Sequence, residues 1–561
     1  MSGQNKTSNV AGVPKGSAAE PTSLSGAARA FTNAARLLRH GPAVGAEASR
    51  FALETARIAV GRSDIAPPRG DRRFADPAWQ GNPVYKRIAQ TYLAGCEAVD
   101  RLGERLVEDD VPHAETARFV SGIITSAMAP TNYYAGNPEA IKKGFDTGGA
   151  SLLKGVSNWA TDLVHNGGMP ATAKPGVFTV GVDLAVTPGS VIARDDVAEL
   201  IQYTPVTEEV YERPTLIIPP PIGRFYFLDL APTRSFVEYA VSEGLQMFML
   251  SWRNPTREQA DWGIDTYAAR ILSAIAEVKA VTGQDDVNVV GFCAGGILES
   301  VALNKIAASG DDSVHSATFA VTLLDWSGKN PINAFNTLST ISFAGWNSQR
   351  KGVMEARSMG SAFTWMRPND LVWNYWVNNY LLGQDPPVFD ILSWNADGTR
   401  LPATLHREFL DIFSKNPLAY PGARTFLGEP VDLSRITVPC FVQGAVNDHL
   451  TPWRGTYRTT ELVGSSDVTY VLSNAGHIAS LVNPPSNLKA SYFTGPPAGR
   501  MDAETWRAGA TKEPGSWWTA WITWCRSHSG DLTAAPSSPG AGPYRELTKA
   551  PGLYVRDKVP A

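Results

Sequence analysis

Cysteine is scarce in this chain: its 561 residues include only four, Cys96, Cys293, Cys440 and Cys525. They lie far apart, form no CxxC pair and have no histidine-rich neighbours. A disulfide framework or a structural zinc site needs paired cysteines or closely spaced ligands, so the sequence argues against both. We therefore expect a reducing compartment, no metal and no cofactor.

Long apolar runs and blocks of positive charge are also lacking. No stretch of about 18 consecutive apolar residues occurs, so the sequence predicts no membrane-spanning helix. The N-terminus lacks the charged start and apolar core of a secretory signal. The net charge is −4 without a basic block, which gives nucleic-acid binding no support. We predict a cytoplasmic protein with a disordered tail over 1–26.

The composition is that of a globular enzyme, with 43% hydrophobic and 19% charged residues. Alanines and aliphatic residues recur at helical spacing in 27–40 and 46–60, with arginines between them. We interpret these segments as packing helices; the alternative is an interfacial helix that touches a hydrophobic surface. The pattern stays mostly helical to about residue 195, so we predict a helical N-terminal domain over 27–195.

After residue 196, short β-rich runs alternate with helical ones. The runs lie at 215–219, 246–252, 286–291, 318–325, 439–444 and 468–473. This alternation predicts an α/β fold whose mostly parallel sheet is covered on both faces. It pauses over approximately 326–438, where many aromatic, Asn and Pro residues indicate an insertion over the edge of the sheet. We predict one catalytic domain over 196–561 that includes this inserted segment.

The stretch "VNVVGFCAGGILES" (287–300) has the order strand, tight turn, helix. Glycines at 291, 295 and 296 flank Cys293 and let the strand and the helix approach closely. Hydrolases with a nucleophile elbow place a serine at this apex, in the pattern G-x-S-x-G. A helix N-terminus favours thiolate over thiol. We predict that Cys293 is a nucleophile; the alternative is a buried structural cysteine beside an incidental glycine cluster.

A thiol nucleophile needs a base, and the base needs a group that orients it. Where the nucleophile sits on such an elbow, an acid and then a histidine follow along the chain, each on a loop after a strand. Asp448 follows the run at 439–444, and His477 follows the run at 468–473. We predict a triad of Cys293, Asp448 and His477.

Other residues compete for these roles. His449, next to Asp448, is a candidate for a contact with substrate or for support of the triad. Asp325 also follows a strand-like run and is the reserve candidate for the acid. We interpret His406, in the insertion, and His528, in a Trp-rich helical stretch, as structural.

Two N–H donors are needed to stabilise the oxyanion of a tetrahedral intermediate. Ala294, directly after the nucleophile, supplies one in this geometry. The second is expected from the loop after an earlier strand, and "IIPPPIGRFYFLDL" (217–230) is such a loop. Ile222 is the first residue after its three prolines that retains an N–H. We predict an oxyanion hole made by Ala294 and Ile222.

Longer motifs resemble the polyhydroxyalkanoate (PHA) synthases of the single-subunit kind, class I or II. The resemblance runs from about residue 71 to the C-terminus. Its motifs are "DRRFADPAWQGNPVY" (71–85), "AMAPTN" (127–132), "LSWRNP" (250–255), "GFCAGG" (291–296), "RPNDLVWNYWVNNYLLG" (367–383), "DHLTPW" (448–453), "SNAGHIASLVNPPSN" (473–487) and "GSWW" (515–518). Together they are highly specific, whereas "GFCAGG" alone also resembles some dienelactone-type hydrolases.

The resemblance implies an α/β-hydrolase fold with a cap subdomain, preceded by a helical N-terminal domain. It implies that Cys293 carries the acyl chain, that His477 is the general base and that Asp448 orients His477. The implied substrate is an (R)-3-hydroxyacyl-CoA, which is joined to a growing polyester with release of CoA. Family members usually act as homodimers at the surface of polymer granules, and no obligate partner subunit is expected.

Several alternatives stay open. Motifs of the short-chain and medium-chain subfamilies are mixed, so the sequence does not predict the monomer length. The aromatic insertion is expected to limit water, and Trp373, Tyr375 and Trp394 either line an acyl path or pack in the core. Other functions are a cysteine-triad esterase, thioesterase or depolymerase, and a granule scaffold with an inert triad.

Overall fold

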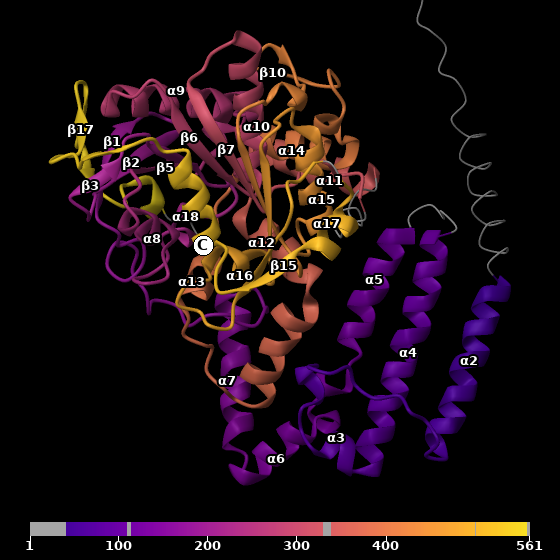
Figure 1. Ribbon diagram of the computed structural model, residues 1–561. Helices are drawn as coiled ribbons and strands as arrows, with labels where there is room; N and C mark the ends of the chain where they lie inside the picture. The colour runs from indigo at the N-terminus through magenta and orange to yellow at the C-terminus, as the bar shows by residue number, and fades with distance from the viewer. Residues whose placement is uncertain (1–40, 109–113, 329–337, 500, 558–561) are drawn as a thin grey trace, which may run out of the picture. The chain divides into compact units, whose positions relative to one another are not determined.

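The computed structural model describes residues 41–108, 114–328, 338–499 and 501–557 (Figure 1). The chain forms two compact units, one of residues up to 68 with 87–114, the other of 69–86 with 115–561. The predicted tail over 1–26 and helix over 27–40 lie outside the described residues. The domain boundary at 195/196 stays a prediction.

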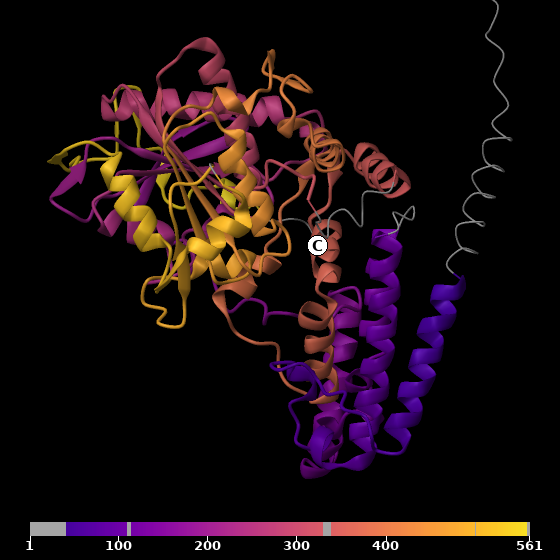
Figure 2. The ribbon, with the colours of Figure 1, turned by 45° about the vertical axis from the view of Figure 1, so that its right-hand side comes forward.

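The smaller unit pairs α2 (Gly41–Ala59), which covers the helix predicted at 46–60, with most of α4 (Pro83–Glu108) (Figure 2). Glu47 is buried on α2 and accepts hydrogen bonds from Arg50 and, across the pair, from Arg101, both at 2.9 Å. A buried carboxylate is costly without such partners. The bond from Arg101 therefore ties the two helices together.

An eleven-stranded sheet forms the centre of the larger unit, in the order β15-β14-β13-β12-β7-β6-β4-β5-β2-β1-β19. Its strands are β1 (Gly189–Arg194), β2 (Ala198–Tyr203), β4 (Thr215–Ile218), β5 (Met247–Trp252), β6 (Val287–Phe292), β7 (Val314–Ala320), β12 (Cys440–Ala445), β13 (Val468–Ser473), β14 (Ser491–Thr494), β15 (Thr511–Pro514) and β19 (Thr548–Lys549). The central strands from β13 to β5 pair in parallel. The predicted α/β sheet is confirmed there, whereas the antiparallel strands on both flanks were not predicted.

Helices cover both faces of the parallel strands. In β4, Leu216 and Ile218 pack in one core cluster with α9 (Ile264–Thr282) and α10 (Ala294–Ser309). The residue between them, Ile217, packs in a second cluster with α8 (Phe236–Ser242) and α18 (Trp518–Ser527). Successive side chains of a strand point to opposite faces, so strands covered on both sides are apolar throughout.

The strand predicted at 318–325 is wrong in its bounds, because β7 spans Val314–Ala320. Val321 has φ 43°, a left-handed conformation that a strand cannot continue, and the chain leaves the sheet there. Residues 321–325 are nevertheless buried. An apolar pattern records burial, so by itself it extended the strand into this loop.

The chain between β7 and β12 holds the inserted segment. Its helices are α11 (Leu338–Lys351), α12 (Ala356–Met366), α13 (Asp390–Ala396) and α14 (Ala403–Lys415), with the π-helical turns η7 (Asn369–Trp373) and η8 (Trp376–Leu381). The helix α7 (Ala150–His165) packs on η8 with Gly155 at the contact, where a Cβ would lie 1.9 Å from the Tyr380 carbonyl oxygen. The Tyr380 hydroxyl donates a hydrogen bond to Asp162 at 2.8 Å. The helix α7, which precedes the strands of the sheet in the chain, therefore holds the inserted segment in place.

Shorter helices precede α7 in the chain, namely α3 (Ala78–Gly81), α5 (Ala114–Ala127) and α6 (Pro138–Asp146). None of the helices in the described ranges combines the length and hydrophobicity that crossing a membrane requires.

Candidate active site

Cys293 lies at a sharp turn between β6 and α10. Its backbone has φ 52° and ψ −123°, a conformation that a residue with a side chain rarely adopts. The turn needs glycine next to it: a Cβ on Gly295 would lie 2.2 Å from the carbonyl oxygen of Ile218. Close packing of β4 against the start of α10 thus holds the strained residue at the apex.

Two further parallel strands end at the same edge of the sheet as β6. Asp448 follows β12, and His477 follows β13 as the first residue of the short helix α16 (His477–Val482). The carboxyl ends of parallel strands share one edge, where open α/β sheets place their ligand sites. Both side chains are buried, and His477 Nδ1 lies 2.6 Å from Asp448 Oδ2.

The environment of His477 favours the imidazolium. Burial acts to lower the pKa of His477, but the negative charge of Asp448, followed by that of Cys293, outweighs burial and raises this pKa well above its ordinary value. Asp448 is the hydrogen-bonded partner of the imidazole, and Cys293 lies close enough to influence its charge. The three predicted residues therefore come together at one edge of the sheet, with the imidazole hydrogen-bonded to the carboxylate and near the sulfur.

Asp448 has a second set of partners that the sequence analysis missed. Thr451 donates to it twice, from its backbone N–H to Oδ1 at 2.9 Å and from its hydroxyl to Oδ2 at 2.8 Å, and the Leu450 N–H donates to Oδ1 at 2.8 Å. Burial opposes ionisation of Asp448, but His477 and these Thr451 bonds keep its pKa below the ordinary value. The D-x-x-T spacing in "DHLT" is a loop-capping pattern and was the available signal.

Asp325, the reserve acid, is committed elsewhere. It is buried, forms an ion pair with Arg458 and accepts hydrogen bonds from Asn416 Nδ2 and the Ser327 N–H, both at 2.8 Å. Nothing in the described part of the chain joins it to His477. The geometry therefore favours Asp448 as the carboxylate beside the imidazole.

His449 directly follows Asp448 in the chain. Its Nδ1 is buried and has no hydrogen-bond partner among the described residues. Burial and the nearby charge of Arg367 lower the pKa of His449 to about 4, so it is neutral near pH 7. Its role in substrate contact or support stays a prediction.

The two histidines interpreted as structural, His406 and His528, have partners away from the triad. His406 is buried, and its Nδ1 lies 2.9 Å from the Ser348 hydroxyl. His528 Nδ1 lies 2.9 Å from the carbonyl oxygen of Trp524, whose ring also packs against the imidazole. Neither shows a contact with the triad in the described part of the chain.

The predicted oxyanion donors lie at two adjoining elements. Ala294 is the first residue of α10, directly after Cys293, and Ile222 packs in the same core cluster as Cys293. The Ile222 N–H donates to no atom of the described chain. The next residue, Gly223, is fixed by its N–H donating to the Thr399 hydroxyl at 2.8 Å. Ile222 follows β4, the strand paired with β6, and an N–H without a partner in that loop fits a donor that a substrate oxyanion would engage.

A buried acid beneath the elbow was also missed. Glu299 on α10 is 1% exposed, and a Cβ on Gly291 would lie 2.0 Å from its Oε2. Burial raises the pKa of Glu299 well above its ordinary value, so its ionised form is disfavoured. Because α10 is buried on almost every side, its sequence shows no single apolar stripe. An acid that faces the core therefore cannot be recognised from the sequence pattern.

No group of three or more His, Cys, Asp or Glu side chains in the described segments could hold a metal ion.

The curated relatives that match this chain in sequence include poly(3-hydroxyalkanoate) polymerases. A family model for the N-terminus of poly-beta-hydroxybutyrate polymerase matches residues 70–240, and one for the alpha/beta hydrolase fold matches 229–484. Poly(3-hydroxyalkanoate) polymerase 1 of Ectopseudomonas oleovorans is 44% identical over 513 residues, covering 91% of this chain and 90% of its own.

The corresponding polymerase subunit of Cupriavidus necator is 37% identical over 509 residues, covering 90% of this chain and 86% of its own. Among solved structures, a monoglyceride lipase of Saccharomyces cerevisiae is 13% identical, with a TM-score of 0.37, covering 64% of this chain and 100% of its own.

Proposed function

Because this chain belongs to the poly(3-hydroxyalkanoate) polymerase family, we propose that it polymerises (R)-3-hydroxyacyl-CoA thioesters and releases CoA through Cys293, His477 and Asp448. The observation that carries the proposal is the buried 2.6 Å contact between His477 and Asp448 at the edge of the sheet where Cys293 lies on a strained turn.

In the first step, the Cys293 thiolate attacks the carbonyl carbon of the acyl-CoA thioester. The tetrahedral oxyanion accepts hydrogen bonds from the N–H groups of Ala294 and Ile222. When the intermediate collapses, the C–S bond to CoA breaks and His477 protonates the leaving thiolate. One thioester replaces another of similar energy, so the acyl group on Cys293 stays activated, whereas an ester on serine would dissipate that energy.

In the second step, His477 removes the proton from the 3-hydroxyl group of another acyl unit. The hydroxyl oxygen attacks the acyl-Cys293 carbonyl, an ester bond forms, and the Cys293 thiolate leaves. Asp448 is the positioning residue of this step, because it fixes the imidazole and stabilises its cationic form. Each addition extends the polyester by one unit.

Water is the competing nucleophile, and an exposed acyl-cysteine would be hydrolysed. Aromatic residues of the inserted segment support a covered site: Trp394 lies over the Ile222 loop, with its Nε1 donating to the Arg224 carbonyl at 2.8 Å. Its ring centroid lies 5.3 Å from that of Phe227, which in turn packs on Phe292, the neighbour of Cys293. Limiting water at the thioester favours attack by an alcohol.

The test is to incubate the purified chain with (R)-3-hydroxyacyl-CoA of several chain lengths and to measure CoA release and insoluble polyester together. We expect both to appear, and both to be lost in Cys293→Ala. CoA release with free hydroxy acids and no polymer would instead assign the site to a thioesterase or another hydrolase. No turnover in the wild-type chain would favour an inert scaffold.

We also expect a homodimer at the surface of polymer granules in the cytoplasm, as the family resemblance implies. Sedimentation of the active enzyme with and without newly made polymer tests both expectations. A monomer that stays in the supernatant while polymer accumulates would contradict them.

A further inference from the structure

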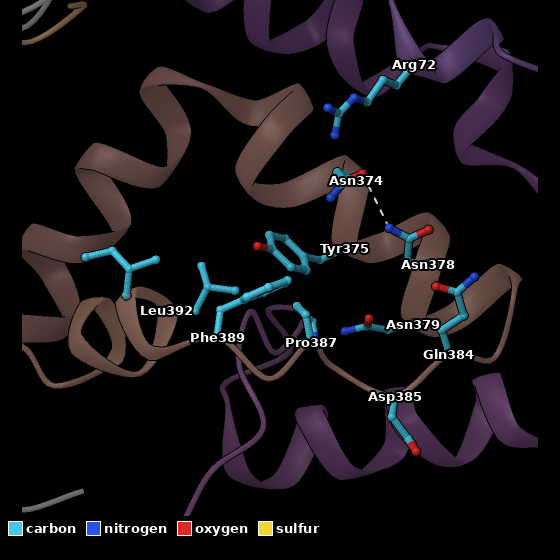
Figure 3. A pocket seen from close by; sticks show the side chains of 11 residues that line it. Arg72, Asn374, Tyr375, Asn378, Asn379, Gln384, Asp385, Pro387, Phe389 and Leu392 are labelled. Atoms are coloured by element: carbon cyan, nitrogen blue, oxygen red, sulfur yellow. Dashed lines mark hydrogen bonds between the residues drawn. The ribbon is translucent and has the colours of Figure 1, made fainter. Parts of the chain in front are cut away.

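A cavity of about 440 Å³ lies in the larger unit, within the segment inserted between β7 and β12 (Figure 3). This volume falls in the range of sites that bind small molecules. None of Cys293, His477 or Asp448 lines it. The cavity is therefore distinct from the catalytic group described above.

Carboxamide side chains supply much of its polar lining: Asn374, Asn378, Asn379 and Gln384. Three of them lie in or beside the π-helical turns η7 and η8. Asn378 Nδ2 donates a hydrogen bond to Asn374 Oδ1 at 3.3 Å, so these two amides lie together (Figure 3), and π-helical turns are frequent at functional sites. The widened turns thus direct several amide groups to one wall.

One of these amides is incompletely satisfied. Asn379 is 1% exposed, and its Nδ2 donates to the Ala171 carbonyl at 2.8 Å. Its Oδ1 is buried and accepts no hydrogen bond from any described residue. An unpaired buried carbonyl oxygen is costly, so the site fits a ligand that brings a hydrogen-bond donor to this position.

The opposite wall is apolar. Tyr375, Pro387, Phe389 and Leu392 gather on one side of the cavity in Figure 3, with Asn378 and Gln384 on the other. Phe389 is 59% exposed although it is a large apolar side chain. The cavity therefore offers amide donors and acceptors facing a surface that suits short alkyl groups.

Charge at the cavity disfavours a highly anionic ligand. Arg72 points into it from the segment before α3, and Asp385 lines it as well, forming an ion pair with Lys154 at 2.9 Å. A single guanidinium with a carboxylate in the same lining suits an uncharged chain with carbonyl oxygens better than a nucleotide with several phosphates.

One wall of the cavity belongs to the same short helix as Trp394, which lies over the Ile222 loop. Ile391 lines the cavity and packs in the same core cluster as Trp394 and Cys293. Ile391 and Trp394 both lie on α13. One short helix therefore contributes to the cavity wall and to the cover over the proposed active site.

We propose that this cavity binds the hydroxyl-terminated end of an oligo(3-hydroxyalkanoate) chain. The terminal 3-hydroxyl donates to Asn379 Oδ1, the ester carbonyls accept from the amides of Asn378 and Gln384, and the alkyl groups pack on Tyr375 and Phe389. The identification of the ligand rests on the proposed function, since the chain is the product of that reaction. A site for its distal end retains the product beside the enzyme between additions.

The test uses the full-length Cys293→Ala chain, which cannot be acylated, and calorimetric titration with two uncharged ligands. One is the methyl ester of the linear (R)-3-hydroxybutyrate trimer, and the other is the same trimer with its hydroxyl acetylated. We expect the acetylated trimer to bind about tenfold more weakly, because it brings no donor to Asn379. In this background, Asn378→Leu and Phe389→Ala should each weaken binding of the free-hydroxyl trimer about tenfold, whereas Phe343→Ala, which removes a ring 67% exposed outside the cavity, should leave it unchanged.

Equal binding of the two trimers, binding unaffected by both lining variants, or no binding of the free trimer would each overturn the proposal. Free pantetheine that binds instead, and loses affinity in Asn378→Leu, would reassign the cavity to the CoA arm of the substrate. Failure here is separable from failure of the proposed function. Polymer made by a wild-type enzyme whose cavity binds no trimer would reject only the cavity, and trimer binding without any polymerisation would reject only the polymerase.

Discussion

Thr451 offers a sensitive test of how the imidazole is positioned. Its hydroxyl donates to Asp448 Oδ2, the same oxygen that contacts His477 Nδ1, at 2.8 and 2.6 Å. Thr451→Val keeps the shape of the side chain and removes the hydroxyl, which also lies 3.4 Å from His477 Nδ1. The Thr451 backbone bond to Oδ1 remains, so the carboxylate loses one defined contact.

A hydrogen bond to a charged group contributes about 1.5–3 kcal/mol. If the whole contribution is lost in the transition state, the rate of CoA release falls by about 10- to 100-fold. The free energy of unfolding should fall by a similar amount, because the buried carboxylate keeps its charge with fewer partners. Thr451→Ser restores the hydroxyl and is the control, with a much smaller loss in both measurements.

The same substitution should change acid stability. The pKa of Asp448 is held below its ordinary value, so its stabilising contribution is present above the unfolded pKa, about 3.9, and is lost as the pH falls through the folded pKa. Without the Thr451 hydroxyl the folded pKa rises, and acid unfolding should begin at a higher pH. If Thr451→Val releases CoA at the wild-type rate and unfolds at the same acidic pH as the wild type, this account of the carboxylate is refuted.

Three further predictions concern the same edge of the sheet. Asp448→Asn should slow CoA release in elongation by orders of magnitude while some acylation of Cys293 remains, measured by single-turnover labelling; equal activity would mean that the acid is misassigned. Glu299→Gln should raise the thermal midpoint of unfolding more at pH 8 than at pH 5. Because the pKa of Glu299 is raised in the folded state, its stabilising contribution is complete below the unfolded pKa and declines as the pH rises, whereas an amide does not titrate. A difference in midpoint that does not change with pH would contradict the raised pKa. Gly295→Ala should lower the free energy of unfolding by about 1–3 kcal/mol or more, because the new methyl group meets backbone atoms. Gly345→Ala in α11, which has open space around it, should cost nothing. Equal effects of the two variants in denaturant titrations would argue against the tight turn at Cys293.

The sequence predicted the parts of this molecule that local patterns encode. The central strands are apolar because both faces are covered, and the glycines around Cys293 are required by contacts shorter than any Cβ permits. The flanking strands depend on distant partners, as when Ser190 in β1 pairs with Lys549 in β19. A two-residue strand carries no periodicity of its own, so no window of the sequence could have predicted that pairing.

Partners, more than positions, distinguish the two candidate carboxylates. Asp325 and Asp448 both follow parallel strands and both are buried at the carboxyl edge of the sheet. Asp325 is neutralised by Arg458, a cation that stays charged at any pH of interest, and its other contacts are to neutral donors. Asp448 instead has neutral donors from the Thr451 turn and one titratable partner, His477.

A carboxylate satisfied by a permanent cation gains nothing when a nearby imidazole is protonated. One whose only charged partner is an imidazole stabilises the imidazolium directly, and that is the state of His477 in the proposed mechanism after it takes a proton. The side chains that face each carboxylate therefore favour Asp448 over Asp325 as the acid. The order of residues along the chain does not reveal these partners.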